Sequence, residues 1–192
     1  MALGYVRPAR VDDAAGIARI QLATWRTAYR RVVPRHVLDR LDEAWLAERW
    51  RAAVTDPPSP AHHVLVAVEQ AETAYLVGFA AVGPADEAAL LPGEPAAEGL
   101  GAVTDLLVEP RWGRRGHGSR LLAAAVTYWR DDGYSSAVAW AFDRDPATRK
   151  FLTAAGWAPD GAARSLDMDD VLVPQVRFHA SLVEEPGDLV EE

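Results

Sequence analysis

The sequence feature that most constrains the fold lies in residues 100–122. The segment LGAVTDLLV has the apolar character of a buried strand, and an apolar helical pattern begins at Leu121. Between them, EPRWGRRGHGSR holds three glycines and four arginines. A strand, a glycine-rich turn and the start of a helix bind anions, because the first helical amides have no intrahelical acceptor and the helix dipole adds positive charge. The stretch therefore predicts a phosphate or pyrophosphate site.

Two common phosphate-binding motifs fit this segment poorly. The run GRRGHGSR has no Gly-Lys-Ser/Thr ending, so it is not a Walker A loop. A dinucleotide-binding turn would be followed by an acid about 20 residues later, and Asp143 stands near that distance. That motif normally begins a fold, however, whereas three predicted strands and two predicted helices come first here. A dinucleotide-dependent oxidoreductase is thus a disfavoured alternative.

The remaining chain alternates strand and helix patterns. Strands are predicted at residues 5–10, 63–69, 74–82, 100–108, 136–142, 162–168 and 173–183, and helices at about 12–29, 35–54, 121–133 and 145–155. The acidic segment 84–98 is expected to form an exposed loop. This order predicts an α/β sandwich with a mixed sheet.

Composition narrows the class of protein. The net charge is −8, which argues against nonspecific nucleic-acid binding. The sequence has no cysteine, which excludes disulfides, catalysis by a cysteine thiolate and cysteine-ligated metals. No third histidine or spaced carboxylate accompanies His62 and His63, so no metal site is predicted. The apolar runs are shorter than the roughly 20 residues that span a bilayer. No membrane partner, no signal peptide and a cytoplasmic location are therefore expected.

Several segments together resemble the GNAT superfamily of N-acetyltransferases. They are YVRPARVDDAAGIARIQLATWRTAYR, VTDLLVEPRWGRRGHGSRLLAAAV, KFLTAAGW and VRFHASL, within residues 5–183. The most specific part is the strand ending in VEP, then GRRGHGSRLL, then FLTAAGW about 35 residues later. The resemblance implies a bacterial-type acetyltransferase, with a largely antiparallel sheet of about seven strands, four flanking helices and a V-shaped splay between strands 4 and 5.

The resemblance also implies acetyl-coenzyme A as co-substrate. It assigns the pantetheine and pyrophosphate contacts to Leu106, Leu107, Val108, Gly113, Arg114, Arg115, Gly116, His117, Gly118, Ser119 and Asp145. Gly113 departs from the family pattern, which has Gln or Arg there. The His117 side chain either touches phosphate or points to solvent. One domain is expected over residues 1–183, followed by a flexible tail at 184–192.

The catalytic groups are less clearly marked. Asp105, in mid-strand, is the leading general base, because burial would raise its pKa, although it could equally bond a neighbouring strand. Glu69 and Glu98 are weaker candidates. The family's tyrosine acid is replaced by Leu152. The thiolate therefore leaves unassisted, or Tyr128, Tyr134 or Ser135 serves, or the protein binds an acyl-coenzyme A with little turnover.

The acceptor is predicted to be the amine of a small molecule or a peptide. The acids Asp86, Glu87, Glu94 and Glu98 either attract a cationic amine or belong to a solvated loop. Trp25 and Tyr29 lie on a helix that the resemblance assigns to one wall of the acceptor site, and core packing is the favoured interpretation of both side chains. The sequence also leaves room for a homodimer, with residues 173–183 as a shared edge strand. The alternative function is a catalytically weak acyl-coenzyme A binding or sensing module.

Overall fold

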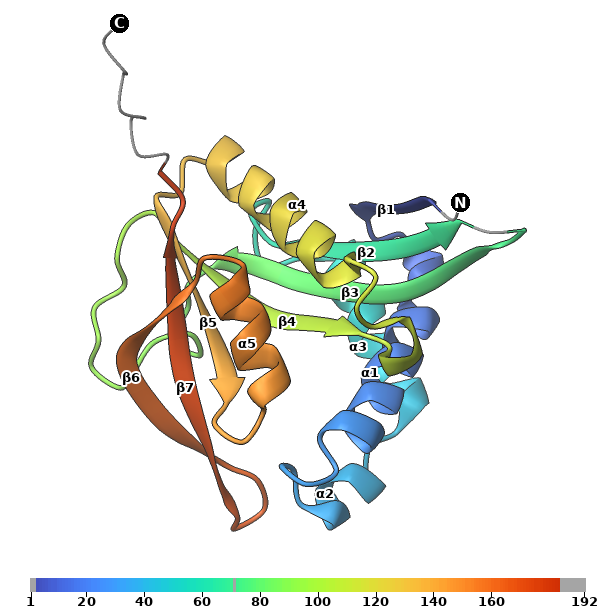
Figure 1. Cartoon of the computed structure of the whole chain (residues 1–192), viewed down its shortest axis with the longest axis horizontal. Coiled ribbons are helices and arrows are strands. Elements are labelled where there is room, and N and C mark those ends of the chain that lie inside the picture. The colour runs from blue at the N-terminus through green and yellow to red at the C-terminus, as the bar shows by residue number, and fades with distance from the viewer. Residues whose placement is uncertain (1–2, 71, 184–192) are drawn as a thin grey trace, which may run out of the picture.

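A computed structural model of the chain describes residues 3–70 and 72–183. In this part, seven strands form one sheet with the order β1-β2-β3-β4-β5-β7-β6, flanked by five α-helices (Figure 1). The strands are β1 (Leu3–Pro8), β2 (His63–Gln70), β3 (Ala74–Pro84), β4 (Leu100–Val108), β5 (Ser136–Phe142), β6 (Ala158–Asp167) and β7 (Leu172–Ser181). The helices are α1 (Ala14–Ala28), α2 (Arg35–Asp39), α3 (Glu43–Thr55), α4 (His117–Asp131) and α5 (Pro146–Ala154).

Antiparallel pairing dominates the sheet. Only β4 and β5 run parallel among the strands of the described residues, and every other neighbouring pair is antiparallel. This topology confirms the predicted GNAT-like mixed sheet. The described strands do not form the doubly wound parallel sheet on which the dinucleotide-binding alternative depends.

Helices pack on both faces of the sheet, as strand alternation dictates. On β2, Leu65 and Ala67 join the apolar cluster that contains Leu121 and Trp129 of α4. The intervening residues Val66 and Val68 belong to a second cluster, formed with α1 and α3. Successive side chains of a strand point to opposite faces, so the two clusters are separate layers of core.

The segment predicted as one helix over 35–54 is two helices. Helix α2 ends at Asp39, and α3 begins at Glu43. The break follows from capping, because the Asp42 side chain accepts a hydrogen bond from the backbone N–H of Trp45 at 2.7 Å. This start signal lies inside the apolar pattern and accounts for five helices where four were expected.

The prediction that residues 173–183 form an edge strand of the sheet was also wrong. Residues 173–183 fall mainly in β7, which pairs with β5 on one side and β6 on the other. The free edges among the described strands are β1 and β6. The predicted tail, 184–192, lies outside the described residues.

Strands β4 and β5 separate partway along their length. Their pairing stops at Val103 and Ala139, although β4 continues to Val108 and β5 to Phe142. On the other side of β4, the register with β3 shifts between Asp105 and Val103, which leaves Thr104 as an extra residue. A bulge bends a strand and increases its twist, so the bulge at Thr104 accounts for the splay at that position. The predicted V-shaped opening is therefore present.

Among the described residues, no helix is both long enough and apolar enough to cross a membrane.

Candidate active site

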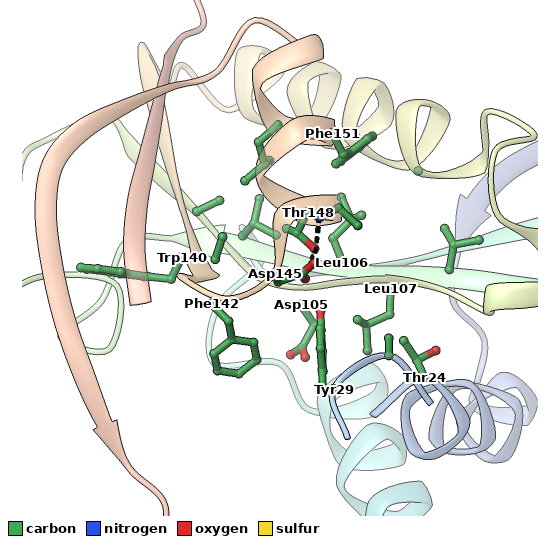
Figure 2. A pocket seen from close by; sticks show the side chains of 18 of the residues that line it. Thr24, Tyr29, Asp105, Leu106, Leu107, Trp140, Phe142, Asp145, Thr148 and Phe151 are labelled. Atoms are coloured by element: carbon green, nitrogen blue, oxygen red, sulfur yellow. Dashed lines mark hydrogen bonds between the residues drawn. The ribbon is translucent and has the colours of Figure 1, made fainter. Parts of the chain in front are cut away.

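A cleft of about 620 Å³ opens where β4 and β5 separate. Its walls come from α1, β4, the loop before α4, β5 and the start of α5. Figure 2 labels lining side chains from the α1 end, β4, β5 and the start of α5. The glycine-rich loop lines one end, and Trp140, Phe142 and residues of β6 line the other. The cleft is mostly apolar with a few polar groups, as small-molecule sites usually are.

The glycine-rich loop presents free backbone amides. Gly116 is the N-cap of α4 with φ +79°, and Arg114 has φ +63°, so two residues of this turn are left-handed. The first helical hydrogen bond runs from Arg120 N–H to the Gly116 carbonyl. Among the described residues, no amide from Arg114 to Ser119 donates to a protein acceptor. Six consecutive unpaired amides at a helix N-terminus suit an anion.

Gly118 keeps the approach to these amides open. A Cβ atom at this position would lie 3.3 Å from the Phe151 ring and 3.9 Å from Leu106. Its backbone needs no left-handed conformation, so a substitution there changes space rather than backbone strain. The absence of a side chain therefore leaves a narrow passage between α4, α5 and β4.

Two side chains of the loop contact Glu69 of β2. Arg115 stacks on Trp112, 4.8 Å from the ring centre, and lies 3.7 Å from the Glu69 carboxylate. His117 is 1% exposed, with its Nε2 3.1 Å from Glu69, so the expected solvent-facing position of its ring was wrong. Burial lowers the pKa of His117, helped by the charge of Arg120. These contacts to β2 anchor the loop from behind.

Asp105 lies immediately after the bulge, opposite Ala81 of β3. It is half-buried, and its carboxylate points into the cleft beside Tyr29 (Figure 2). Burial raises the pKa of Asp105 from the ordinary 3.8 to about 7, with the Arg49 charge opposing the change. A carboxyl group with such a pKa can accept a proton near neutral pH. Of the other candidate bases, Glu69 is buried behind the loop and Glu98 borders a separate surface hollow.

Tyr29 packs in the core with its ring and lines the cleft with its hydroxyl. Its ring packs edge-on against Trp25 and Phe142, with centroids 5.8 and 5.1 Å away, as the core prediction requires. Its hydroxyl points toward Asp145 in the cleft (Figure 2). Burial raises the pKa of Tyr29 to about 12, and the negative charge of Asp145 adds to the effect. The phenol is therefore protonated at neutral pH and can donate a hydrogen bond.

The start of α5 is fixed by Asp145. Its carboxylate accepts hydrogen bonds from the N–H groups of Ala147 and Thr148, both at 3.1 Å, and from the Thr148 hydroxyl. The predicted N-cap is therefore formed, and the carboxylate already has three donors. Leu152, about two turns after Asp145, is 4% exposed and belongs to the core cluster of the sheet.

The acidic loop, residues 84–98, is hydrogen-bonded to the sheet and is only partly solvated. Glu94 accepts two hydrogen bonds from the Arg177 guanidinium, at 2.6 and 2.9 Å. Asp86 accepts from the N–H groups of Ala88 and Ala89. The Ala89 carbonyl in turn accepts from Trp140 Nε1 at 2.8 Å. Two of the four acids are thus used internally.

The cleft gathers nearly all of the predicted site residues. Those that line it are Asp105, Leu106, Leu107, Val108, Gly113, Arg114, Gly116, His117, Gly118, Ser119 and Asp145. Arg115 lies outside it. The alternative acids also lie elsewhere: Tyr128 stacks on His63, Tyr134 lines the separate surface hollow, and Ser135 contacts Gly99. For Tyr29, the sequence interpretation favoured core packing over a place in the cleft wall, whereas in the structure the residue both packs in the core and lines the cleft.

Comparisons with known proteins support this architecture. The model of the acetyltransferase (GNAT) family matches residues 19–157. A curated relative, the uncharacterized N-acetyltransferase YuaI of Bacillus subtilis (strain 168), is 29% identical over 143 residues, which cover 74% of this chain and 73% of the relative.

Solved structures share the fold at low sequence identity. The structure of yncA from Salmonella typhimurium with its cofactor acetyl-CoA is 17% identical, with a TM-score of 0.68, and the match covers 95% of this chain and 96% of that one. PaiA N-acetyltransferase from Thermoplasma acidophilum, in complex with coenzyme A, is 11% identical with a TM-score of 0.63, over 93% and 99% of the two chains.

Proposed function

The chain belongs to the acetyltransferase (GNAT) family, and from this premise we propose that it transfers the acetyl group of acetyl-coenzyme A to a primary amine of a small molecule or peptide. The observation that carries the proposal is the cleft between β4 and β5, with unpaired loop amides at one end and Asp105 at its wall. The thioester of acetyl-coenzyme A supplies the acyl group and a thiolate leaving group.

The loop amides from Arg114 to Ser119 bind the pyrophosphate in this proposal. Their lack of protein acceptors, the left-handed Gly116 and the open space at Gly118 all suit a close phosphate. Arg114 is exposed and lines the cleft, so it can add charge where Gly113 offers no side chain. The complexes of yncA with acetyl-CoA and of PaiA with coenzyme A support the same ligand here.

The edge of β4 that faces the splay binds the pantetheine arm. From Thr104 to Val108 this edge has no partner strand among the described residues, so its N–H and C=O groups are available. An extended chain can pair with such an edge as an added strand does. The N–H of Leu107 or Val108 would then polarise the thioester carbonyl.

Asp105 acts as the general base. A protonated amine is not a nucleophile, and a carboxylate with a pKa of about 7 can take its proton directly or through water. Leu107, two residues along the strand, packs with α1 and α3, so Asp105 is on the same face of the sheet as Tyr29, the C-cap of α1. The amine is therefore expected to enter from the α1 side of the sheet.

Tyr29 is the proposed hydrogen-bond donor to the leaving thiolate. Its hydroxyl lies in the same cleft as Asp105, and its pKa of about 12 keeps the proton available. Leu152, at the family's usual tyrosine position, is apolar and buried, so α5 offers no acid there. Asp145 caps the start of α5. In this proposal it also lies next to the bound coenzyme A, as the family resemblance implies.

A weak acyl-coenzyme A binding or sensing module is the second candidate, favoured by Leu152 and Gly113. Acetyl-coenzyme A, coenzyme A and NAD would each be tested for thermal stabilisation of the protein, followed by thiol release over an amine panel. The proposal predicts stabilisation by both coenzyme A forms and amine-dependent thiol release. Stabilisation by NAD alone would refute it, and binding without thiol release would favour the sensing module.

A further inference from the structure

Arg164 of β6 lines the cleft at the end opposite the glycine-rich loop. Its guanidinium carbon Cζ lies over the Trp140 ring, 4.1 Å from the centroid. Nε donates to Gln175 Oε1 at 2.8 Å, and Nη1 donates to the Ala88 carbonyl. Gln175 is itself buried, with 7% exposure. The side chain is therefore held in one position by β5, β7 and the loop before β4.

The charge of Arg164 has no anionic partner. Its neighbour Arg177 binds two carboxylates, those of Glu94 and Asp160. By contrast, Arg164 forms no ion pair with any described residue, and it is half-buried. Burial lowers the pKa of Arg164, and the charge of Arg177 adds to the effect. A partly desolvated cation normally has a counter-charge, so this position lacks one.

The guanidinium of Arg164 also has N–H donors that no acceptor among the described residues uses. A guanidinium carries five N–H groups in a planar fork, and two of them are used by Gln175 and Ala88. The remaining three suit a carboxylate, which arginine binds through two parallel hydrogen bonds. The contact with the Trp140 ring and the two hydrogen bonds hold the guanidinium in place at the cleft wall.

This inference rests on the proposed function. We propose that Arg164 binds a carboxylate of the acceptor, so that the acceptor is an amino acid or a similar amine that carries a carboxylate. Asp105 would receive the ammonium end, and Arg164 the anionic end, of one zwitterionic molecule. Phe142 and Leu166 provide apolar cleft wall for its carbon skeleton.

A purely cationic acceptor such as a diamine fits this arrangement less well. Its second ammonium would meet the uncompensated charge of Arg164. The acids of the loop 84–98 that could have attracted it are partly occupied, because Glu94 is paired with Arg177 and Asp86 caps a turn. The positive charge of Arg164, unpaired among the described residues, therefore favours an anionic group at this end of the cleft.

The test compares each standard L-amino acid with its own carboxamide, and adds the diamine cadaverine. Thiol release from acetyl-coenzyme A gives kcat/KM for the wild-type protein, Arg164→Gln and Arg164→Lys. The control is Arg51→Gln, an exposed arginine of α3 paired with Glu48. The α-amine of an amino acid and that of its carboxamide differ in basicity. We define the acid-to-amide preference as kcat/KM for the amino acid divided by kcat/KM for its carboxamide. Dividing the preference of the wild type by that of each variant cancels the difference in basicity.

Arg164→Gln should reduce the acid-to-amide preference by roughly 10- to 100-fold, the usual worth of a charge-assisted hydrogen-bonded pair. Arg164→Lys should lose less, Arg51→Gln nothing, and the KM for acetyl-coenzyme A should stay unchanged in all variants. An unchanged preference, a raised KM for acetyl-coenzyme A in Arg164→Gln, or a wild-type preference for cadaverine over every amino acid would overturn the proposal.

A binding measurement separates failure of this proposal from failure of the proposed function. If no amine gives thiol release, calorimetric titration of the same amino acids into the protein saturated with coenzyme A decides the role of Arg164. Binding that is lost in Arg164→Gln supports the carboxylate site even without turnover. Absence of amino-acid binding to the wild type, or equal binding to Arg164→Gln, refutes it.

Discussion

Replacement of Asp105 by asparagine should lower the catalytic rate and raise the stability of the protein, and both effects test the role of this carboxyl group. Asparagine has nearly the same shape but cannot accept the proton of the amine. General-base catalysis typically contributes 10²- to 10⁴-fold, so Asp105→Asn should lower kcat/KM by roughly 100-fold or more at pH 8. Glu72→Gln, an exposed acid in the turn after β2, is the matched control and should leave kcat/KM unchanged.

The pH dependence of this loss follows from the pKa of Asp105. With a pKa of about 7, the wild-type carboxylate is mainly charged at pH 8 and mainly protonated at pH 5. The acceptor amine titrates identically in both proteins, so the ratio of wild-type to variant kcat/KM isolates Asp105. That ratio should level off above pH 7 and fall by about tenfold for each pH unit below it. A ratio that is flat from pH 5 to 8 would remove Asp105 from the role of base.

The same pKa predicts the opposite effect on stability. The folded protein holds a proton on Asp105 from the ordinary pKa of 3.8 up to about 7, whereas the unfolded chain has lost it. The stability contributed by this protonated group is complete below pH 3.8 and is lost as pH rises toward 7. The loss is of the order of 4 kcal/mol, an upper bound set by the pKa difference.

Asparagine does not ionise, so a protein with asparagine at position 105 does not lose this stability as the pH rises. Asp105→Asn should therefore be more stable than the wild type at pH 8 by up to about 4 kcal/mol. The advantage should shrink steadily as pH falls toward 4. Urea denaturation at a series of pH values measures it. Equal or lower stability of Asp105→Asn at pH 8 would contradict the burial argument.

Three further substitutions test other parts of the site. Gly118→Val should weaken acetyl-coenzyme A binding by roughly tenfold or more in calorimetric titration, because its side chain meets Phe151, whereas unchanged affinity would count against phosphate binding at the loop. Tyr29→Phe keeps the edge-on ring contacts and should lower kcat by roughly tenfold or more without changing Tm; an unaltered kcat would exclude the hydroxyl as donor. Asp145→Ala should reduce the free energy of unfolding by about 1 kcal/mol through loss of the α5 cap, with Asp145→Asn restoring most of it in urea titrations.

Local patterns were sufficient to predict most elements and the phosphate loop. Strands β4 and β5 coincide with residues 100–108 and 136–142, because continuous apolar runs bounded by glycine and polar residues are short-range signals. The turn before α4 was predictable for the same reason. Gly116 acts through its own left-handed backbone, which depends little on distant parts of the chain, whereas the role of Gly118 depends on its approach to Phe151.

Features that depend on distant contacts were not predictable in this way. The bulge at Thr104 arises from the pairing of β4 with β3, and the internal place of β7 from the hairpin with β6. The chemical difference between Arg164 and Arg177 depends on Glu94, which is 83 residues from Arg177 in sequence. Sequence spacing carries no information about such pairs.

The most direct test of the account is to follow the acetyl group itself. The protein would be incubated with acetyl-coenzyme A carrying a ¹³C-labelled acetyl group and the amine that gives the fastest thiol release. Mass spectrometry of the amine would follow, with Asp105→Asn as the slow control. The account predicts labelled N-acetyl product in the same amount as free coenzyme A thiol, formed much more slowly by Asp105→Asn. Thiol release with labelled acetate and no acetylated amine, or intact acetyl-coenzyme A with every amine, would contradict it.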